Sequence, residues 1–322
     1  MTQEAHYDII VIGAGPIGLT LGIEAKKAGL THLIIEKGVL VNSIFNFPTN
    51  MTFFSTSKLL EIGEVPFISH SDKPTRREAL EYYRRVYDAW DLNIHFYEEV
   101  TDYSGEKGNF QISTSKGKYS CNNIVLATGF YDSPRLLDVP GEELPKVRHY
   151  YQEPHIYVGQ KLVVIGAANS ACDVALETYH KGADVTMVVR EPTIYERVKY
   201  WIKPNIENRI KEGSIKAFFN SKVIKIEEDH VIIKTPDGEI KYPNDFVLAM
   251  TGYKPNYQLM DLLGLQYEQD EWKTPVHNEE TLESSIKGIY LAGVVKAGLR
   301  TSLLFIENTR HHAKAIVKHM KG

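Results

Sequence analysis

A glycine-rich turn near the start of this chain has the residue types needed to bind phosphate groups. It reads Gly13-Ala14-Gly15-Pro16-Ile17-Gly18 and directly follows a β-branched apolar run. The first glycine permits a tight bend, the second lets the backbone approach a pyrophosphate, and Gly18 allows close packing of helix on strand. The helix that follows offers free N–H groups and partial positive charge to the phosphates. Glu36, 23 residues after Gly13, is placed to accept hydrogen bonds from ribose hydroxyls.

A second turn of the same kind, Gly166-Ala167-Ala168-Asn169-Ser170-Ala171, lies later in the chain. Where the first unit has an acid, this one has Arg190, 24 residues after the first glycine of the turn. A guanidinium binds the 2′-phosphate of NADPH, whereas a carboxylate repels it. The second unit therefore predicts NADPH rather than NADH, with Arg197 or Lys199 as a second cation. Its candidate contacts are Gly166, Ala168, Asn169, Ser170, Arg190 and Arg197.

Cysteine chemistry is restricted, because the chain has only two cysteines, Cys121 and Cys172. They are 51 positions apart and no CxxC pair exists, which excludes a dithiol redox motif and a four-cysteine zinc site. No HxxxH or HExxH pattern occurs, so no metal site is expected. Two isolated cysteines are typical of a reducing cytoplasm.

Each glycine turn must be positioned by a strand before it and a helix and strand after it. The first turn follows the run Tyr7–Ile12, and its helix extends to Ala28, before a second strand at Thr31–Glu36. The second turn follows Lys161–Ile165, with a helix to about Lys181 and a strand at Asp184–Arg190. The turns start 153 residues apart, so each belongs to its own dinucleotide-binding domain. The predicted fold class is α/β, with two Rossmann-like domains.

The order of the elements predicts that one domain is inserted into the other. Apolar runs end at Ala127-Thr128-Gly129 and at Met250-Thr251-Gly252, which fit two interdomain crossings. The chain then closes with a strand at Gly288–Val294 and a helix from about Ser302. We expect an FAD-binding domain at 1–132 and 249–322, and an NADPH-binding domain at 133–248. FAD is the simplest partner for NADPH, because hydride passes from nicotinamide to isoalloxazine.

Composition and charge limit the classes of partner. The 37 Lys and Arg residues face 41 Asp and Glu residues, giving a net charge of −4. This balance argues against general nucleic-acid binding and against a polybasic membrane surface. The stretch Met1–Glu4 is acidic rather than basic, and nowhere do 18 apolar residues follow one another. We expect a cytoplasmic protein that acts on a small-molecule redox acceptor; self-association into a homo-oligomer is left open.

The chain resembles the thioredoxin-reductase-like flavoproteins, and within them the bacillithiol-disulfide reductase (YpdA-type) family. The resemblance covers nearly the whole chain. The stretches that carry it are Val41–Thr49, Thr52–Ser55, Leu59–Gly63, Ala127–Asp132, Met250–Tyr253 and Phe305–Asn308 with Arg310. The resemblance implies FAD, NADPH and the reduction of a low-molecular-weight disulfide such as bacillithiol disulfide. It also implies that Asn42–Phe54 lies beside the flavin.

The FAD site is expected to draw on both ends of the chain. Gly293 would let the backbone pass the ribityl chain, and the helix beginning near Thr301 and Ser302 would point its N-terminus towards flavin N1 and O2. The FAD-binding candidates are Gly13, Gly15, Pro16, Ile17, Gly18, Glu36, Lys37, Asn42, Ser43, Asn46, Thr49, Phe54, Val100, Ala127, Thr128, Gly129, Gly293, Val294, Thr301 and Ser302.

Two positions depart from the patterns of these families. Members of the bacillithiol-disulfide reductase family commonly have a cysteine after the proline of the first turn, where this chain has Ile17. The acid that often follows the last glycine in the wider superfamily is Val294 here. No side chain is therefore assigned as nucleophile. The candidates are Cys172, whose pKa a helix N-terminus can lower, and His311 or His312, which could protonate a leaving thiolate.

Three other functions fit the same architecture. A ferredoxin–NADP reductase also lacks CxxC and passes single electrons to an iron–sulfur protein. A flavin monooxygenase is a second alternative, although Tyr151 stands where its fingerprint expects glycine. A redox-sensing protein that keeps FAD without rapid turnover is the third.

Overall fold

The computed structural model describes residues 6–322 and divides into two compact units. One unit comprises the chain up to Ser133 together with Tyr253–Gly322, and the other is Pro134–Gly252. The crossings carry two short strands, β7 (Ser133–Pro134) and β16 (Tyr253–Lys254). The stretch Met1–Glu4, which entered the expectation of a cytoplasmic protein, lies outside the described residues. Within residues 6–322, no helix combines the length and the apolar character needed to span a bilayer.

The first unit is built on a seven-stranded sheet in the order β3-β2-β1-β6-β5-β4, with β17 paired to β6. The strands β1, β2, β3, β6 and β17 run parallel, whereas β4 and β5 form an antiparallel extension. Because β6 is long, its first half pairs with β5 and its second half with β17. The strands are β1 (His6–Ile12), β2 (His32–Ile35), β3 (Ile94–His95), β4 (Val100–Ser104), β5 (Phe110–Thr114), β6 (Lys118–Leu126) and β17 (Ile289–Leu291).

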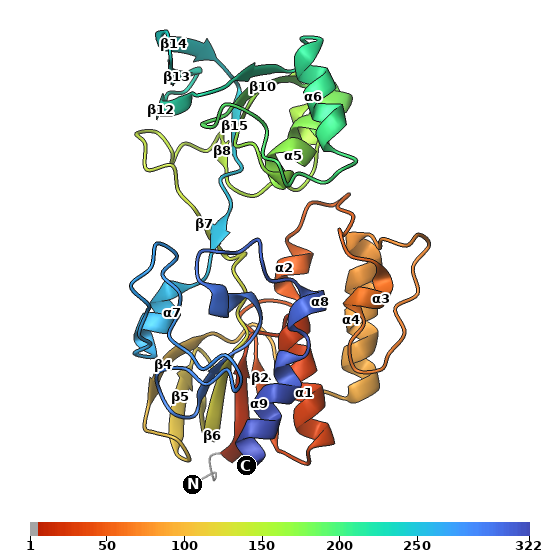
Figure 1. Ribbon diagram of the computed structural model, residues 1–322, viewed down its shortest axis with the longest axis vertical. Helices are drawn as coiled ribbons and strands as arrows, with labels where there is room; N and C mark the ends of the chain where they lie inside the picture. Colours follow the sequence, from red (N-terminus) through yellow and green to blue (C-terminus); the bar gives the residue numbers. More distant parts are fainter. Residues whose placement is uncertain (1–5) are drawn as a thin grey trace. The chain divides into compact units, whose positions relative to one another are not determined.

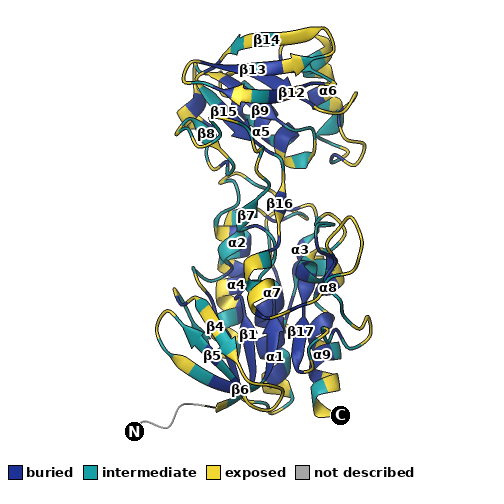
Figure 2. Cartoon of the chain, turned by 90° about the vertical axis from the view of Figure 1, so that its left-hand side faces the viewer, coloured by how far each residue is buried: buried dark blue, intermediate teal, exposed yellow. Residues whose placement is uncertain are grey.

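Both faces of this sheet are covered, which explains the continuous apolar run of β1. Ile9 and Val11 pack in a core with α1 (Pro16–Lys27), α4 (Arg76–Trp90) and α9 (His312–Lys321). Ile10 and Ile12 point to the opposite face, where β5 and α7 (Tyr257–Leu262) close a second core. Figure 1 shows α1 and α9 side by side along the sheet, and β1 and β17 are dark with burial in Figure 2.

The remaining helical segments of this unit are short and follow the strand ends. They are α2 (Asn42–Phe45), α3 (Ser57–Leu60), the 3-10 segment η2 (Gly293–Ala297) and α8 (Ile306–Thr309).

The second unit has the same strand–helix–strand order of elements as the first. Its five-stranded parallel sheet has the order β11-β10-β9-β15-β8, and a separate antiparallel sheet has the order β12-β13-β14. Together with the family comparison below, this architecture confirms the predicted fold class. The elements are β8 (Val147–Arg148), the 3-10 segment η1 (His155–Tyr157), β9 (Lys161–Ile165), α5 (Asn169–His180), β10 (Asp184–Val188), α6 (Lys203–Lys211), β11 (Lys216–Phe218), β12 (Lys222–Ile226), β13 (His230–Thr235), β14 (Gly238–Pro243) and β15 (Phe246–Ala249).

The predicted C-terminal helix is present but begins later than Ser302. Residues 299–305 form turns, and the helix begins at Ile306 as α8, followed by α9 from His312. The cause is a side-chain cap, because the Phe305 N–H donates to Asn308 Oδ1 at 2.7 Å and Asn308 Nδ2 donates to the Leu303 carbonyl at 3.0 Å. The predicted strand at Gly288–Val294 is likewise shorter, since η2 begins at Gly293.

Candidate functional site

The three glycines of the first turn have different structural reasons to be glycine. Gly13 has φ +107°, and a Cβ there would lie 2.7 Å from the Ala127 carbonyl oxygen. A Cβ on Gly18 would overlap the carbonyl oxygen of Gly13 itself. Gly15 has ordinary extended dihedrals and no atom within 4 Å of the Cβ it lacks. The fold therefore requires Gly13 and Gly18, whereas Gly15 leaves free space beside the start of α1.

That free space lies where the sequence predicts the diphosphate. Gly15 is the N-cap of α1, Pro16 occupies the first turn, and no side chain caps the exposed N–H groups. Unsatisfied N–H groups at a helix N-terminus attract anions.

Glu36 is held directly beside this turn. It follows β2, is buried, and its two oxygens accept the N–H groups of Ala14 and Gly38, each at 2.8 Å. Burial raises the pKa of the carboxyl, and the two N–H donors oppose that rise. Each oxygen keeps a second lone pair, so the carboxylate can still accept a ribose hydroxyl.

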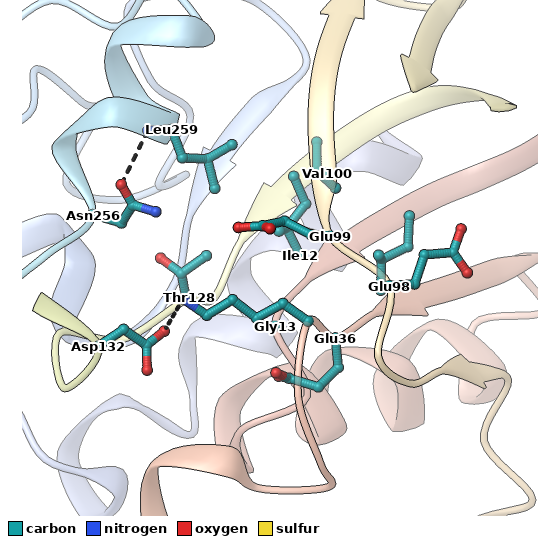
Figure 3. A pocket seen from close by; sticks show the side chains of 12 residues that line it. Ile12, Gly13, Glu36, Glu98, Glu99, Val100, Thr128, Asp132, Asn256 and Leu259 are labelled. Carbon is teal, nitrogen blue, oxygen red and sulfur yellow. Dashed lines mark hydrogen bonds and ion pairs between the residues drawn. The ribbon is translucent and has the colours of Figure 1, made fainter. Parts of the chain in front are cut away.

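A hollow beside Glu36 is lined by further acids (Figure 3). Lys37 borders it and forms an ion pair with Asp132 at 2.9 Å. Glu98 is buried and accepts hydrogen bonds from Thr114 and from the His95 ring. A 2′-phosphate is disfavoured beside so many carboxylates, whereas the uncharged hydroxyls of a ribose are not. The lining residues are Ile12, Gly13, Ile35, Glu36, Lys37, Glu98, Glu99, Val100, Thr128, Asp132, Asn256 and Leu259.

Sequence reasoning placed five of these residues in the FAD site and missed the other acids and α7. Asp132 closes the stretch that begins at Ala127, so its position after the strand was an available signal. Glu98 and Asn256 had no such signal, because the pairing of β3 with β2 brings Glu98 to the hollow and the packing of α7 on the sheet brings Asn256 there.

The stretch after β2 returns to the first turn through α2. The Val41 N–H donates to the Ala14 carbonyl at 3.0 Å, and the Ser43 hydroxyl lies 4.0 Å from the Cβ position of Gly129. The Asn46 carbonyl accepts the Tyr131 hydroxyl at 3.2 Å, and the Asn46 side chain donates to the Asn42 carbonyl. The structure thus brings Asn42, Ser43, Asn46 and Gly129 together near the turn.

Two predicted residues of the same stretch lie at the surface. Thr49 is exposed, and Phe54 is 58% exposed with the Lys73 ammonium 4.8 Å from its ring centre.

The C-terminal strand end also reaches the first turn. Gly293 has φ +78°, and its Cβ position lies 3.3 Å from Ile17 Cγ1. Its N–H donates to His312 Nδ1 at 3.1 Å. Val294 lies in η2, and Thr301 and Ser302 lie in a turn rather than at a helix N-terminus. The predicted helix-dipole contribution from Thr301 and Ser302 to flavin N1 and O2 is therefore withdrawn, because no helix begins there.

Burial disfavours the acid–base role considered for His312 and the thiol chemistry considered for Cys172. Burial lowers the pKa of His312 to about 4, and its Nδ1 already accepts the Gly293 N–H, so the ring is neutral at physiological pH. Burial, with nearby Asp173 and Glu207, raises the pKa of the Cys172 thiol to about 12. Cys121 is equally buried and its pKa is raised to about 12. His311 is exposed and packs edge-on against His312.

The second turn begins, like the first, with a glycine whose φ is positive. Gly166 has φ +126°, and a Cβ there would lie 2.6 Å from the Met250 carbonyl oxygen. Ala168 is the exposed N-cap of α5, followed by the partly exposed Asn169 and the exposed Ser170. The Arg190 side chain is 84% exposed after β10, and within residues 6–322 its one ion pair is with Glu191, at 3.2 Å. In residues 6–322, no group of three histidine, cysteine or acidic side chains is arranged to hold a metal ion.

A family of known proteins matches a stretch of the chain that includes both glycine turns. The family described as pyridine nucleotide-disulphide oxidoreductase matches residues 10–293. The chain is 43% identical over 305 residues to bacilliredoxin reductase Bdr of Bacillus subtilis (strain 168), which is 94% of each chain. The chain belongs to the Bdr family of pyridine nucleotide-disulphide oxidoreductases.

Solved structures of the Bdr family have the same fold as this chain. The bacillithiol disulfide reductase Bdr (YpdA) from Staphylococcus aureus matches with a TM-score of 0.95 and 41% identity over 98% of each chain. The protein of the same name from Bacillus cereus also reaches 0.95, with 39% identity over 98% of this chain and 99% of that one. The chain is thus an NADPH-dependent flavoprotein oxidoreductase, and the predicted family, enzyme class and cofactors, FAD and NADPH, are confirmed.

Position 17 distinguishes this Bdr-family chain from the expected cysteine-containing pattern. Ile17 is 9% exposed and packs in the core that contains β1, α1 and α9, with Gly293 against its side chain. The isoleucine is therefore a packing residue at the junction of the first turn and the C-terminal strand.

Because two histidines are buried, we expect the free energy of unfolding of this Bdr-family protein to decrease as the pH falls from about 6.5 to about 4. Burial lowers the pKa of His32 and of His312 to about 4, from 6.5, so the folded state keeps both neutral. The unfolded chain takes up protons below pH 6.5, so it binds more protons than the folded chain in this window. Stability is then complete above pH 6.5 and falls with pH, by roughly 3 kcal/mol per histidine at pH 4.

Urea unfolding at pH 7 and pH 4.5 measures this loss. His32→Phe keeps an aromatic ring and removes a ring nitrogen, Nε2, that has no partner among the described residues. The difference between the two pH values should shrink in this variant and stay unchanged in His70→Phe, which alters an exposed histidine. Equal pH dependence in His32→Phe and the unaltered protein would contradict the prediction.

Proposed function

We propose that the chain uses NADPH to reduce bacillithiol disulfide, or a low-molecular-weight disulfide of the same kind. The observation that carries the proposal is the 43% identity to Bdr over 94% of the chain, together with two nucleotide turns. The overall change is NADPH + H⁺ + RSSR → NADP⁺ + 2 RSH. Two electrons leave the nicotinamide as hydride, and the S–S bond breaks to give two thiols.

We assign FAD to the unit that contains Glu36 and NADPH to the unit that contains Arg190. The acidic hollow beside Gly13 and the open space at Gly15 support FAD in the first unit. The exposed arginine after β10 supports a 2′-phosphate in the second. FAD, when bound, accepts hydride from nicotinamide and delivers two electrons to a disulfide.

The chain's own thiols take no part in the proposed reaction. Cys121 and Cys172 are free but fully buried, and burial raises both pKa values to about 12. A thiol rather than a thiolate is a poor nucleophile. The protein therefore contributes orientation of the two nucleotides and exclusion of water, and no protein disulfide forms. Two unpaired thiols and a thiol-producing reaction also support a cytoplasmic location.

The test is an acceptor assay with purified, FAD-loaded protein under nitrogen. Bacillithiol disulfide should accelerate steady-state NADPH oxidation at least about tenfold over the rate without acceptor. Oxidised ferredoxin is the comparison acceptor. Faster reduction of ferredoxin than of any low-molecular-weight disulfide would overturn the proposal in favour of electron transfer. A peroxyflavin spectrum on adding oxygen would favour the monooxygenase, and flavin reduction over minutes would favour a sensor.

Variants at position 17 test whether a protein thiol is needed. Ile17→Cys restores the family's cysteine, and Ile17→Ala makes a comparable reduction in side-chain size without a thiol. Because residue 17 is buried against Gly293, we expect the two variants to reduce the disulfide at rates within about twofold of each other. A much faster Ile17→Cys variant would show that thiol chemistry limits this chain.

A further inference from the structure

A loop after β10 is tied to the second glycine turn by the side chain of Asn169 and by one backbone hydrogen bond. The Lys199 N–H donates to Asn169 Oδ1 at 2.8 Å, and Asn169 Nδ2 approaches the Arg197 carbonyl at 3.5 Å. A backbone bond from the Tyr195 N–H to the Ala167 carbonyl, at 3.1 Å, joins the same two segments. Asn169 is the first residue of α5, so its side chain connects the helix N-terminus with two backbone groups of the loop.

The loop is anchored underneath and carries one unpaired cation. Ile194 and Val198 are buried in the core of the unit, which fixes the loop on α5 and β10. Lys199 Nζ forms an ion pair with Asp173 on α5 at 2.8 Å, and its side chain is only 15% exposed, whereas the Arg190 side chain is 84% exposed. Arg197 is exposed, and its guanidinium makes no ion pair within residues 6–322. Of the two predicted second cations, the geometry therefore favours Arg197.

The Arg190 guanidinium is not held in a fixed orientation in which it could bind a 2′-phosphate. Among the residues that the structure describes, its only ion pair is with its neighbour Glu191, and both side chains are more than half exposed. Exposed pairs of this kind are screened by water and hold neither side chain in one geometry. A second cation on a fixed loop would bind the 2′-phosphate more tightly than Arg190 does alone. A charged group that is already positioned loses less conformational entropy on binding.

We propose that Asn169 is a positioning residue for cofactor selectivity, which holds the 194–199 loop so that Arg197 acts with Arg190 on the 2′-phosphate of NADPH. The proposal rests on the assignment of NADPH to this unit. Asn169 itself need not touch the phosphate. Its role is to keep Arg197 on the same edge as the N-terminus of α5, where the diphosphate binds.

Binding of NADP⁺ and NAD⁺ to the oxidised holoenzyme tests the proposal without turnover. The two ligands differ only in the 2′-phosphate, so their ratio of dissociation constants, measured by calorimetry, reports its recognition. Asn169→Ala should weaken NADP⁺ binding about tenfold and NAD⁺ binding less than about twofold. Arg197→Ala should do the same, and the double variant should be no weaker than Arg197→Ala alone, because both changes remove one interaction. Asn208→Ala, on the exposed side of α6, is the matched control.

The outcomes distinguish a failure of the role of Asn169 from a failure of the assignment of NADPH to this unit. An unaltered protein that binds NAD⁺ as tightly as NADP⁺ would overturn the NADPH assignment itself. A selective unaltered protein with undiminished selectivity in Asn169→Ala would overturn only the role of Asn169, as would additive losses in the double variant. Should Asn169→Ala fail to fold, Arg197→Ala still decides, because Arg197 is exposed and full selectivity in that variant contradicts the proposal.

Discussion

Replacing Gly18 with alanine is expected to destabilise the protein by roughly 3 kcal/mol or more and to leave it without FAD. The added Cβ would overlap the carbonyl oxygen of Gly13, and neither the turn nor α1 can shift without disturbing the core that Ile17 and Leu19 enter. Both partners are backbone, so no side-chain rotation relieves the contact. Urea unfolding of the purified variant and the flavin absorbance retained after desalting measure the two losses.

Gly15→Ala is the matched comparison in the same turn. No atom lies within 4 Å of the new methyl, and the φ of −72° suits any residue, so the free energy of unfolding without FAD should change by less than about 1 kcal/mol. The methyl would instead occupy the space assigned to the pyrophosphate, and FAD affinity should fall at least about 100-fold. A Gly15→Ala protein that retains FAD would contradict the placement of the diphosphate at the start of α1.

These two glycines show why the nucleotide turns could be predicted from the sequence. The strand before the turn, the bend at Gly13 and the contact of Gly18 on Gly13 all involve residues close together in the chain. Steric constraints between neighbouring residues therefore determine the glycine spacing, which can be recognised in the sequence. The same holds for Glu36, which follows the next strand and returns to Ala14.

Properties set by distant parts of the chain could not be predicted in this way. The helix N-terminus should lower the pKa of Cys172, but burial and two acids, one of them Glu207 on α6, raise it. The acidic lining contributed by Glu98 depends on the pairing of β3 with β2, after which the Glu98 N–H donates to the Glu36 carbonyl at 2.9 Å. The start of α8 depends on the Asn308 cap, which a search for apolar periodicity does not detect.

Glu36→Ala is expected to have the second large effect, on stability as well as on FAD. Removing the carboxylate leaves the buried N–H of Ala14 and the half-buried N–H of Gly38 without their acceptor, and a buried unsatisfied donor costs about 1–3 kcal/mol. The first turn then loses the bond that fixes it beside β2. We expect FAD to be absent from the purified variant, and the urea midpoint of the apoprotein to fall.

Glu36→Gln separates the two roles of this side chain. The amide keeps one oxygen for one N–H but turns its NH₂ group towards the other donor, so about half of the stability loss should remain. Glu106→Ala, at an exposed loop position of the same unit, should change neither quantity. FAD retention in Glu36→Ala at the level of Glu106→Ala would show that the carboxylate serves only the turn. Since the same two oxygens that hold the turn face the hollow, we expect turn and cofactor to be lost together.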